Sequence, residues 1–166
     1  MNFELIATFA NISLTLSVAV AIVFGIAQVR DAARNRKEKL TLETLRNFQT
    51  REFAECVSYV MSRDIPNTLK ELRSRTTEEQ VMFTHFAQQM ESLGILVADN
   101  LVDLDLVDKT HGSLVSTAWH KYEKMFLSMR GEDPFIGEYF QWLAEQVERR
   151  LKENPRKPMY KFLAKP

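Results

Sequence analysis

The sequence has 166 residues, with 22 basic and 22 acidic side chains, and its formal net charge is zero. A single cysteine excludes an internal disulfide, and the length is that of one compact domain. Basic residues are in excess in residues 30–63 and 156–166, a distribution that suits an anionic membrane leaflet better than nucleic acid, so we expect no nucleic-acid partner.

An uncharged stretch opens the chain. Residues 5–29 contain no Asp, Glu, Lys, Arg or His, and 19 of these 25 residues are apolar, counting Gly25. As a helix they cover roughly 37 Å, enough to cross a hydrocarbon core of about 30 Å. A cleaved signal peptide has a basic start and a shorter apolar run, and a buried core helix of this length needs a larger domain around it. Residues 1–29 are therefore predicted to be a transmembrane anchor in a lipid bilayer.

Basic side chains follow the anchor and predict its orientation. Lys and Arg close to a span stay on the cytoplasmic side, whereas the other flank carries only Glu4 and the amino group. We expect a single-pass protein of the cell membrane with its N-terminus outside and its body cytoplasmic. The residues expected to contact headgroups of the inner leaflet are Arg30, Arg34, Arg36, Lys37 and Lys39.

Small residues recur every four positions within the anchor, at Ser13, Ser17, Ala21 and Gly25. This spacing lets two helix backbones approach closely in lipid, and it predicts a homo-oligomer packed through the span. The alternative is that small residues are simply common in spans. The hydroxyl groups of the span can bond to carbonyls of the preceding turn, so Asn11 is the polar side chain that needs a hydrogen-bond partner outside its own helix.

The segment after the anchor continues as a helix in our prediction, because residues 28–63 contain no Gly or Pro. Asp64, with Pro66 in the first turn, is predicted to cap a short helix. Thr76 and Glu79 form a capping box for the next helix, which ends near Asp99 and Asn100.

Three more helices complete the predicted bundle. Asp103 is interpreted as the cap of a helix of one or two turns, and a separate helix runs from Thr110 to Met129. Asp133 and Pro134 are predicted to open the last helix, which buries an apolar face that includes Phe135, Ile136 and Leu151 and ends at Asn154 and Pro155.

The predicted fold is all-α, with one N-terminal transmembrane helix that continues into a cytoplasmic bundle of about four to five helices. Its parts are the anchor at 1–29, a juxtamembrane helix at 30–63, the bundle at 64–154 and a C-terminal tail at 155–166. The tail lies on lipid headgroups or is a disordered terminus. It mixes the basic residues Arg156, Lys157, Lys161 and Lys165 with the apolar residues Met159, Tyr160, Phe162 and Leu163.

No motif in the sequence indicates a particular enzymatic reaction. The acidic series from Asp103 lacks the Gly and Glu of a calcium loop, and His85, His111 and His120 lack the three- or four-residue spacing of a helical metal site. Cys56 is interpreted as a small buried residue. We therefore expect no metal, no cofactor and no enzymatic activity.

Several stretches resemble a known family. They are 93–97 (LGILV), 100–103 (NLVD), 105–107 (DLV), Trp119 and 140–143 (FQWL). The chain resembles an uncharacterised family of small, mostly bacterial proteins with a domain of unknown function. The resemblance implies an N-terminal span and an all-helical cytoplasmic domain, and it supplies no catalytic residues.

These observations favour a protein-interaction or regulatory module at the inner membrane face, with a cytoplasmic protein partner that the sequence does not identify. A first alternative is a membrane effector, a pore-forming or membrane-disrupting component of a defence or toxin system. A second alternative is an enzyme with an unrecognised site.

Overall fold

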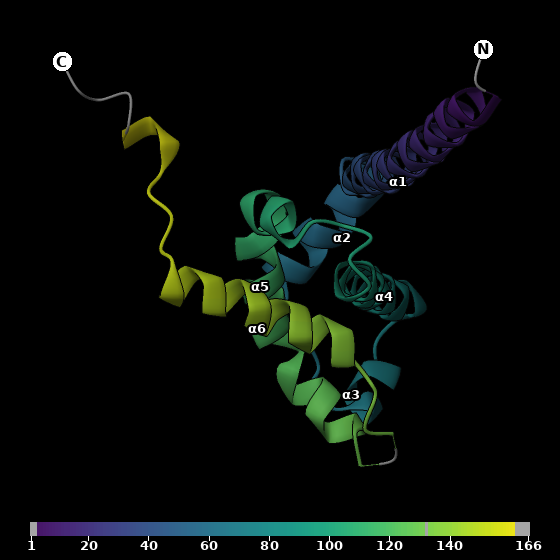
Figure 1. The fold of residues 1–166 in the computed structure, drawn as a ribbon. Helices are drawn as coiled ribbons and strands as arrows, with labels where there is room; N and C mark the ends of the chain where they lie inside the picture. Colours follow the sequence, from purple (N-terminus) through teal and green to yellow (C-terminus); the bar gives the residue numbers. More distant parts are fainter. Residues whose placement is uncertain (1–2, 132, 162–166) are drawn as a thin grey trace. The chain divides into compact units, whose positions relative to one another are not determined.

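The computed structural model describes residues 3–131 and 133–161, and these residues form helices and no strand (Figure 1). The predicted all-α class is thus confirmed. The helices are α1 (Phe3–Asn47), α2 (Arg51–Ser62), α3 (Leu69–Arg73), α4 (Thr77–Ala98), α5 (Leu104–Met129) and α6 (Glu138–Glu153), followed by the short 3-10 helix η1 (Met159–Lys161).

Contacts divide the chain into two units after Lys39. The first unit is the N-terminal part of α1, in which every described side chain from Phe3 to Arg36 is exposed. The second unit begins at Leu40 and contains the last turns of α1 and all the other helices. Part of the segment predicted as juxtamembrane, residues 40–63, therefore belongs with the bundle.

The long first helix continues past Val29, as predicted, but it ends at Asn47 rather than running on to Arg63. Two interactions explain the break. Thr50 caps α2 by accepting a hydrogen bond from the backbone N–H of Phe53 at 3.2 Å. The Phe48 ring is buried against the rings of Phe53 and His111, with centroids 4.8 and 4.9 Å away, and this burial turns the chain between the helices.

Aromatic side chains fill the centre of the second unit, where α6 packs on α4 and α5 and α2 packs on α4. The rings of Phe86 and Tyr122 stack at 5.8 Å, and Phe140 meets both of them edge-on. The buried Tyr122 hydroxyl donates to the backbone oxygen of Phe83 at 2.9 Å, so its polar atom is satisfied inside the core.

Two predicted helix boundaries are confirmed and one is wrong in this region. Thr76 and Glu79 form the capping box of α4, and Asp99 is its C-cap. Asp64 caps no helix, however, because Thr68 is the N-cap of α3 and accepts a hydrogen bond from the backbone N–H of Glu71 at 3.2 Å. Pro66 is buried ahead of α3 instead of forming its first turn.

The two helices predicted after Asp103 are one helix. Asp103 is the N-cap, as predicted, but α5 then runs without a break from Leu104 to Met129. Gly112 lies within it and is buried. A Cβ there would lie 3.2 Å from a methyl group of Val147, so this glycine brings α5 close to α6 rather than ending a helix.

The last helix begins later than predicted. Asp133 precedes turns that occupy residues 134–137, and α6 begins at Glu138 after Gly137, which has a φ of 66°. Because Phe135 falls in these turns, its side chain is 69% exposed rather than buried, and Leu151 on α6 is also exposed. Asn154 is the C-cap of α6, as predicted.

Candidate functional site

The residues predicted to pack one span against another lie on the exposed part of α1. The Ser17 hydroxyl donates to the Ser13 backbone oxygen at 2.8 Å, and the Thr15 hydroxyl donates to the Asn11 backbone oxygen at the same distance. These hydroxyl groups are satisfied within their own helix and do not oppose burial in lipid. A Cβ added to Gly25 would have no other heavy atom within 4 Å, so the surface of α1 is open at this position.

Large apolar side chains of the same helix are uncovered. Phe9, Phe24 and Val29 are 65–71% exposed, so α1 buries none of its apolar window in the protein. Among the described residues, α1 is the one helix that is long and apolar enough to cross a membrane. A core helix of a soluble protein passes the same test of length and composition, but its apolar face is covered by other elements.

The residues predicted to contact headgroups follow this apolar part on the same helix. Arg34 pairs with Glu38 at 3.1 Å, and both side chains are largely exposed, so this ion pair contributes little to stability. The five basic residues occupy α1 itself: Arg30, Arg34, Arg36, Lys37 and Lys39.

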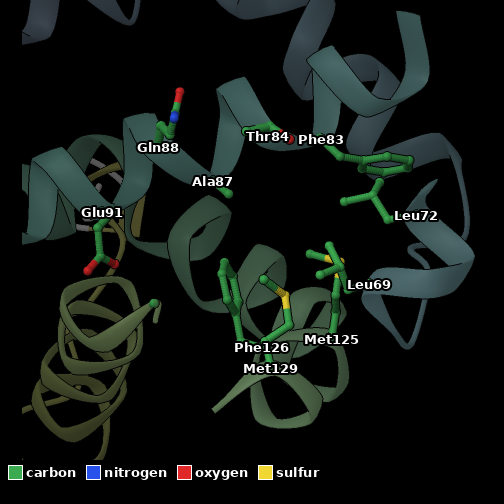
Figure 2. Close-up of a pocket in the computed structure, with 11 residues that line it drawn as sticks. Leu69, Leu72, Phe83, Thr84, Ala87, Gln88, Glu91, Met125, Phe126 and Met129 are labelled. Atoms are coloured by element: carbon green, nitrogen blue, oxygen red, sulfur yellow. The ribbon is translucent and has the colours of Figure 1, made fainter. Parts of the chain in front are cut away.

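An apolar pocket of about 330 Å³ opens on the bundle (Figure 2). One wall is α4, and the end of α5 and the short helix α3 form the others, as Figure 2 shows. The apolar side chains that line it are Leu69, Leu72, Phe83, Ala87, Met125, Phe126 and Met129, and the polar ones are Thr84, Gln88 and Glu91.

The carboxylate in the pocket wall is already used by the fold. The two oxygens of Glu91 accept the backbone N–H groups of Tyr139 and Phe140 at 3.1 and 2.8 Å, and they thereby cap α6, whose N-cap Gly137 has no side chain. The pocket therefore offers an apolar surface with flexible methionines, which suits the binding of an apolar group.

The three histidines lie in three separate environments. His85 contacts Gln89 at 3.1 Å, and the ring of His111 lies 4.9 Å from that of Phe48 and 6.5 Å from that of Phe53. Burial holds the pKa of His111 below its usual range. The third, His120, is 2.8 Å from Glu148 at the surface.

A serine, a histidine and a carboxylate meet on the surface of α5 and α6, which the sequence analysis did not foresee. The Ser116 hydroxyl donates to an oxygen of Glu148 at 2.6 Å, and His120 contacts the same oxygen. The Ser116 bond, followed by the nearby His120, holds the pKa of Glu148 below its usual range. This is not a nucleophilic triad, because the serine is bonded to the carboxylate and not to the histidine.

Cys56 is buried in the core, as predicted, with its sulfur 3.4 Å from that of Met82. Burial raises the pKa of the Cys56 thiol, and the nearby Glu52 and Glu55 add to this shift. A buried thiol with a raised pKa is a packing group and not an activated nucleophile.

A buried carboxylate fixes the start of the C-terminal tail. The Asp108 side chain is 2% exposed, and one of its oxygens lies 3.3 Å from Nε of Arg156 and 3.9 Å from Nε of Arg150. Arg156 also donates to the Asp108 backbone oxygen at 3.0 Å. Sequence reasoning missed this ion pair because its partners lie 48 residues apart. The predicted tail residues Phe162, Leu163 and Lys165 lie outside the described residues.

Three comparisons with known proteins gave one match. No curated protein and no solved structure matches the chain. A family match covers residues 15–147, which include the second half of the apolar stretch and most of the bundle. The chain belongs to the family described as a domain of unknown function, DUF4760.

Proposed function

We propose that the chain is a single-pass membrane protein of the cell membrane whose helical bundle binds a protein partner at the inner face. Residues 1–29 span the bilayer with the N-terminus outside, and the bundle is cytoplasmic. Copies of the chain associate through Ser13, Ser17, Ala21 and Gly25, and the module acts by binding rather than by catalysis.

One observation carries this proposal. The described side chains of α1 are exposed from Phe3 to Arg36, and those from Ile6 to Val29 carry no charge. Leaving such an apolar surface in water is costly, at roughly 25 cal/mol for each Å². A lipid bilayer covers an all-round apolar helix without any further protein element, and it keeps the backbone polar groups paired within the helix.

The chemistry of the bundle supports binding. Its apolar pocket is lined mainly by Leu, Phe and Met side chains, and the carboxylate of Glu91 is committed to the backbone of α6. The thiol of Cys56 is buried. These groups suit contact with a partner better than proton transfer or nucleophilic attack.

Membrane extraction and protease protection test the anchor and its orientation. The full chain should stay in the pellet after a carbonate wash, and protease added to sealed spheroplasts should leave the bundle intact. A matched control is the replacement of Ile12, Leu16 and Val20 by Lys, because charges at the centre of a span oppose insertion. Release of the unaltered chain by carbonate, or cleavage of the bundle from outside, would contradict the proposal.

A further inference from the structure

The C-terminal segment leaves the bundle at the end where α1 enters it. Phe48, the first residue after α1, packs on His111 of α5 at 4.9 Å. Asp108 lies three residues before His111, one turn away on the same helix, and it holds Arg156. The entry of α1 and the exit of the tail therefore lie within about one helical turn of each other along α5.

Arg156 fixes this exit point. Its guanidinium group makes an ion pair with the buried carboxylate of Asp108 at 3.3 Å and a hydrogen bond with the backbone oxygen of the same residue at 3.0 Å. Because the carboxylate is 2% exposed, removing Arg156 would leave this buried charge with only the more distant Arg150, at 3.9 Å. The tail accordingly starts from a defined place and is not loose from the end of α6 onwards.

Beyond Arg156, the described tail presents apolar side chains to the solvent. Met159 and Tyr160 are 78% and 70% exposed in η1, and Lys157 and Lys161 lie on either side of them. The sequence contains no acidic side chain after Glu153. An exposed aromatic and apolar pair between lysines is complementary to an anionic lipid surface, where tyrosine takes the interfacial level and lysine pairs with lipid phosphates.

We propose that the segment from Lys157 to Lys161 docks on the anionic leaflet in which α1 is anchored, as a second membrane contact of the same chain. This inference rests on the proposed function, since α1 brings the bundle to the membrane. Residues 40–47, the last turns of α1, are about 12 Å long as a helix, and the five residues of the docking segment extend to at most about 18 Å from Arg156. The segment is thus long enough to reach back along α1 as far as Lys39, the last of the basic residues predicted to contact headgroups.

A weak intrinsic affinity is sufficient for this contact. A single short segment with two lysines and two apolar side chains binds lipid only marginally on its own. The anchor makes the second contact intramolecular, so its effective concentration is high. The preference for anionic over neutral lipid comes from charge, because each lysine near an anionic surface strengthens the docking equilibrium about fivefold.

An environment-sensitive fluorophore tests the docking. The full chain carrying Cys56→Ala and Tyr160→Cys, labelled at the new thiol with NBD, is reconstituted into vesicles of phosphatidylcholine alone or with a quarter of phosphatidylglycerol. We expect blue-shifted emission, and quenching by brominated lipids, in the anionic vesicles. Lys157→Gln with Lys161→Gln should weaken the docking equilibrium about thirtyfold. A label at Lys124→Cys, exposed farther along α5, should stay aqueous throughout.

The outcomes separate this inference from the anchor. Vesicle flotation first selects the protein that is inserted, and a failure to float contradicts the proposed function. If the protein floats but the NBD label remains aqueous, the tail does not dock and this inference is overturned. A blue shift that brominated lipids do not quench places the segment on protein instead, and an equal shift in neutral vesicles removes the role of charge. Either result overturns the inference as well.

Discussion

His111 connects the end of α1 to the bundle through its ring. It lies 4.9 Å from the ring of Phe48 and is hydrogen-bonded to the Thr110 hydroxyl at 2.9 Å. Burial lowers its pKa, so the folded protein holds this imidazole neutral at a pH where the unfolded chain already binds a proton. Protonation therefore opposes the packing of His111 against Phe48 inside the second unit.

Acid should accordingly destabilise the bundle through this residue. The contribution of neutral His111 to the free energy of unfolding is fully present above the unfolded pKa of about 6.5 and is lost as the pH drops below it. Because one proton is involved, the loss is at most about 1.4 kcal/mol per pH unit. The free energy of unfolding, measured with urea in detergent at about pH 7 and pH 5.5, should fall for the unaltered protein and change less for His111→Gln. An unchanged pH dependence in His111→Gln would show that another group titrates.

At the scale of the elements, local signals were enough to predict the helices, and contacts between distant residues decided their ends. The capping box at Thr76 and Glu79 lies within four residues, so the sequence reveals it. The break after Asn47 depends on Phe48 packing against His111, and the start of α6 depends on Glu91, 48 residues before Tyr139. No pattern in a short window contains these pairs. The pocket was also missed, because the sequence of an apolar helix face is the same whether another element covers that face or leaves it open.

The contact between α4 and α6 depends on Gly94. A Cβ at this position would lie 2.3 Å from the backbone oxygen of Tyr139. Because this atom belongs to the backbone, the clash cannot be relieved by the movement of a flexible side chain. We expect Gly94→Ala to force the helices apart and to lower the free energy of unfolding by about 1–3 kcal/mol, measured by urea denaturation of the full chain in detergent. Gly131→Ala is the matched control, since a Cβ there meets nothing within 4 Å. Equal stabilities of the two variants would show that α4 and α6 tolerate a wider separation.

At the scale of the whole molecule, the apolar helix and the bundle belong together in the family. The family match begins at Thr15, inside the uncharged stretch, and extends to Val147 of α6. The family domain therefore includes the second half of the proposed span as well as the bundle. It also includes Ser17, Ala21 and Gly25, which we propose as the contact between copies.

Two identical substitutions test that contact. Ala21 lies on the line of small residues, and Ala19 lies about 200° away from it around the helix, so Ala→Leu at either position adds the same apolar bulk on opposite sides. Leucine at 21 should hold two backbones apart and weaken association by about 1–3 kcal/mol, or roughly five- to 150-fold, whereas leucine at 19 should leave it unchanged. Energy transfer between labelled full-length chains in vesicles measures the equilibrium. Because both variants are equally apolar and insert equally well, equal losses at 19 and 21 would place the contact elsewhere on α1, and no energy transfer in the unaltered chain would make the span a monomeric anchor.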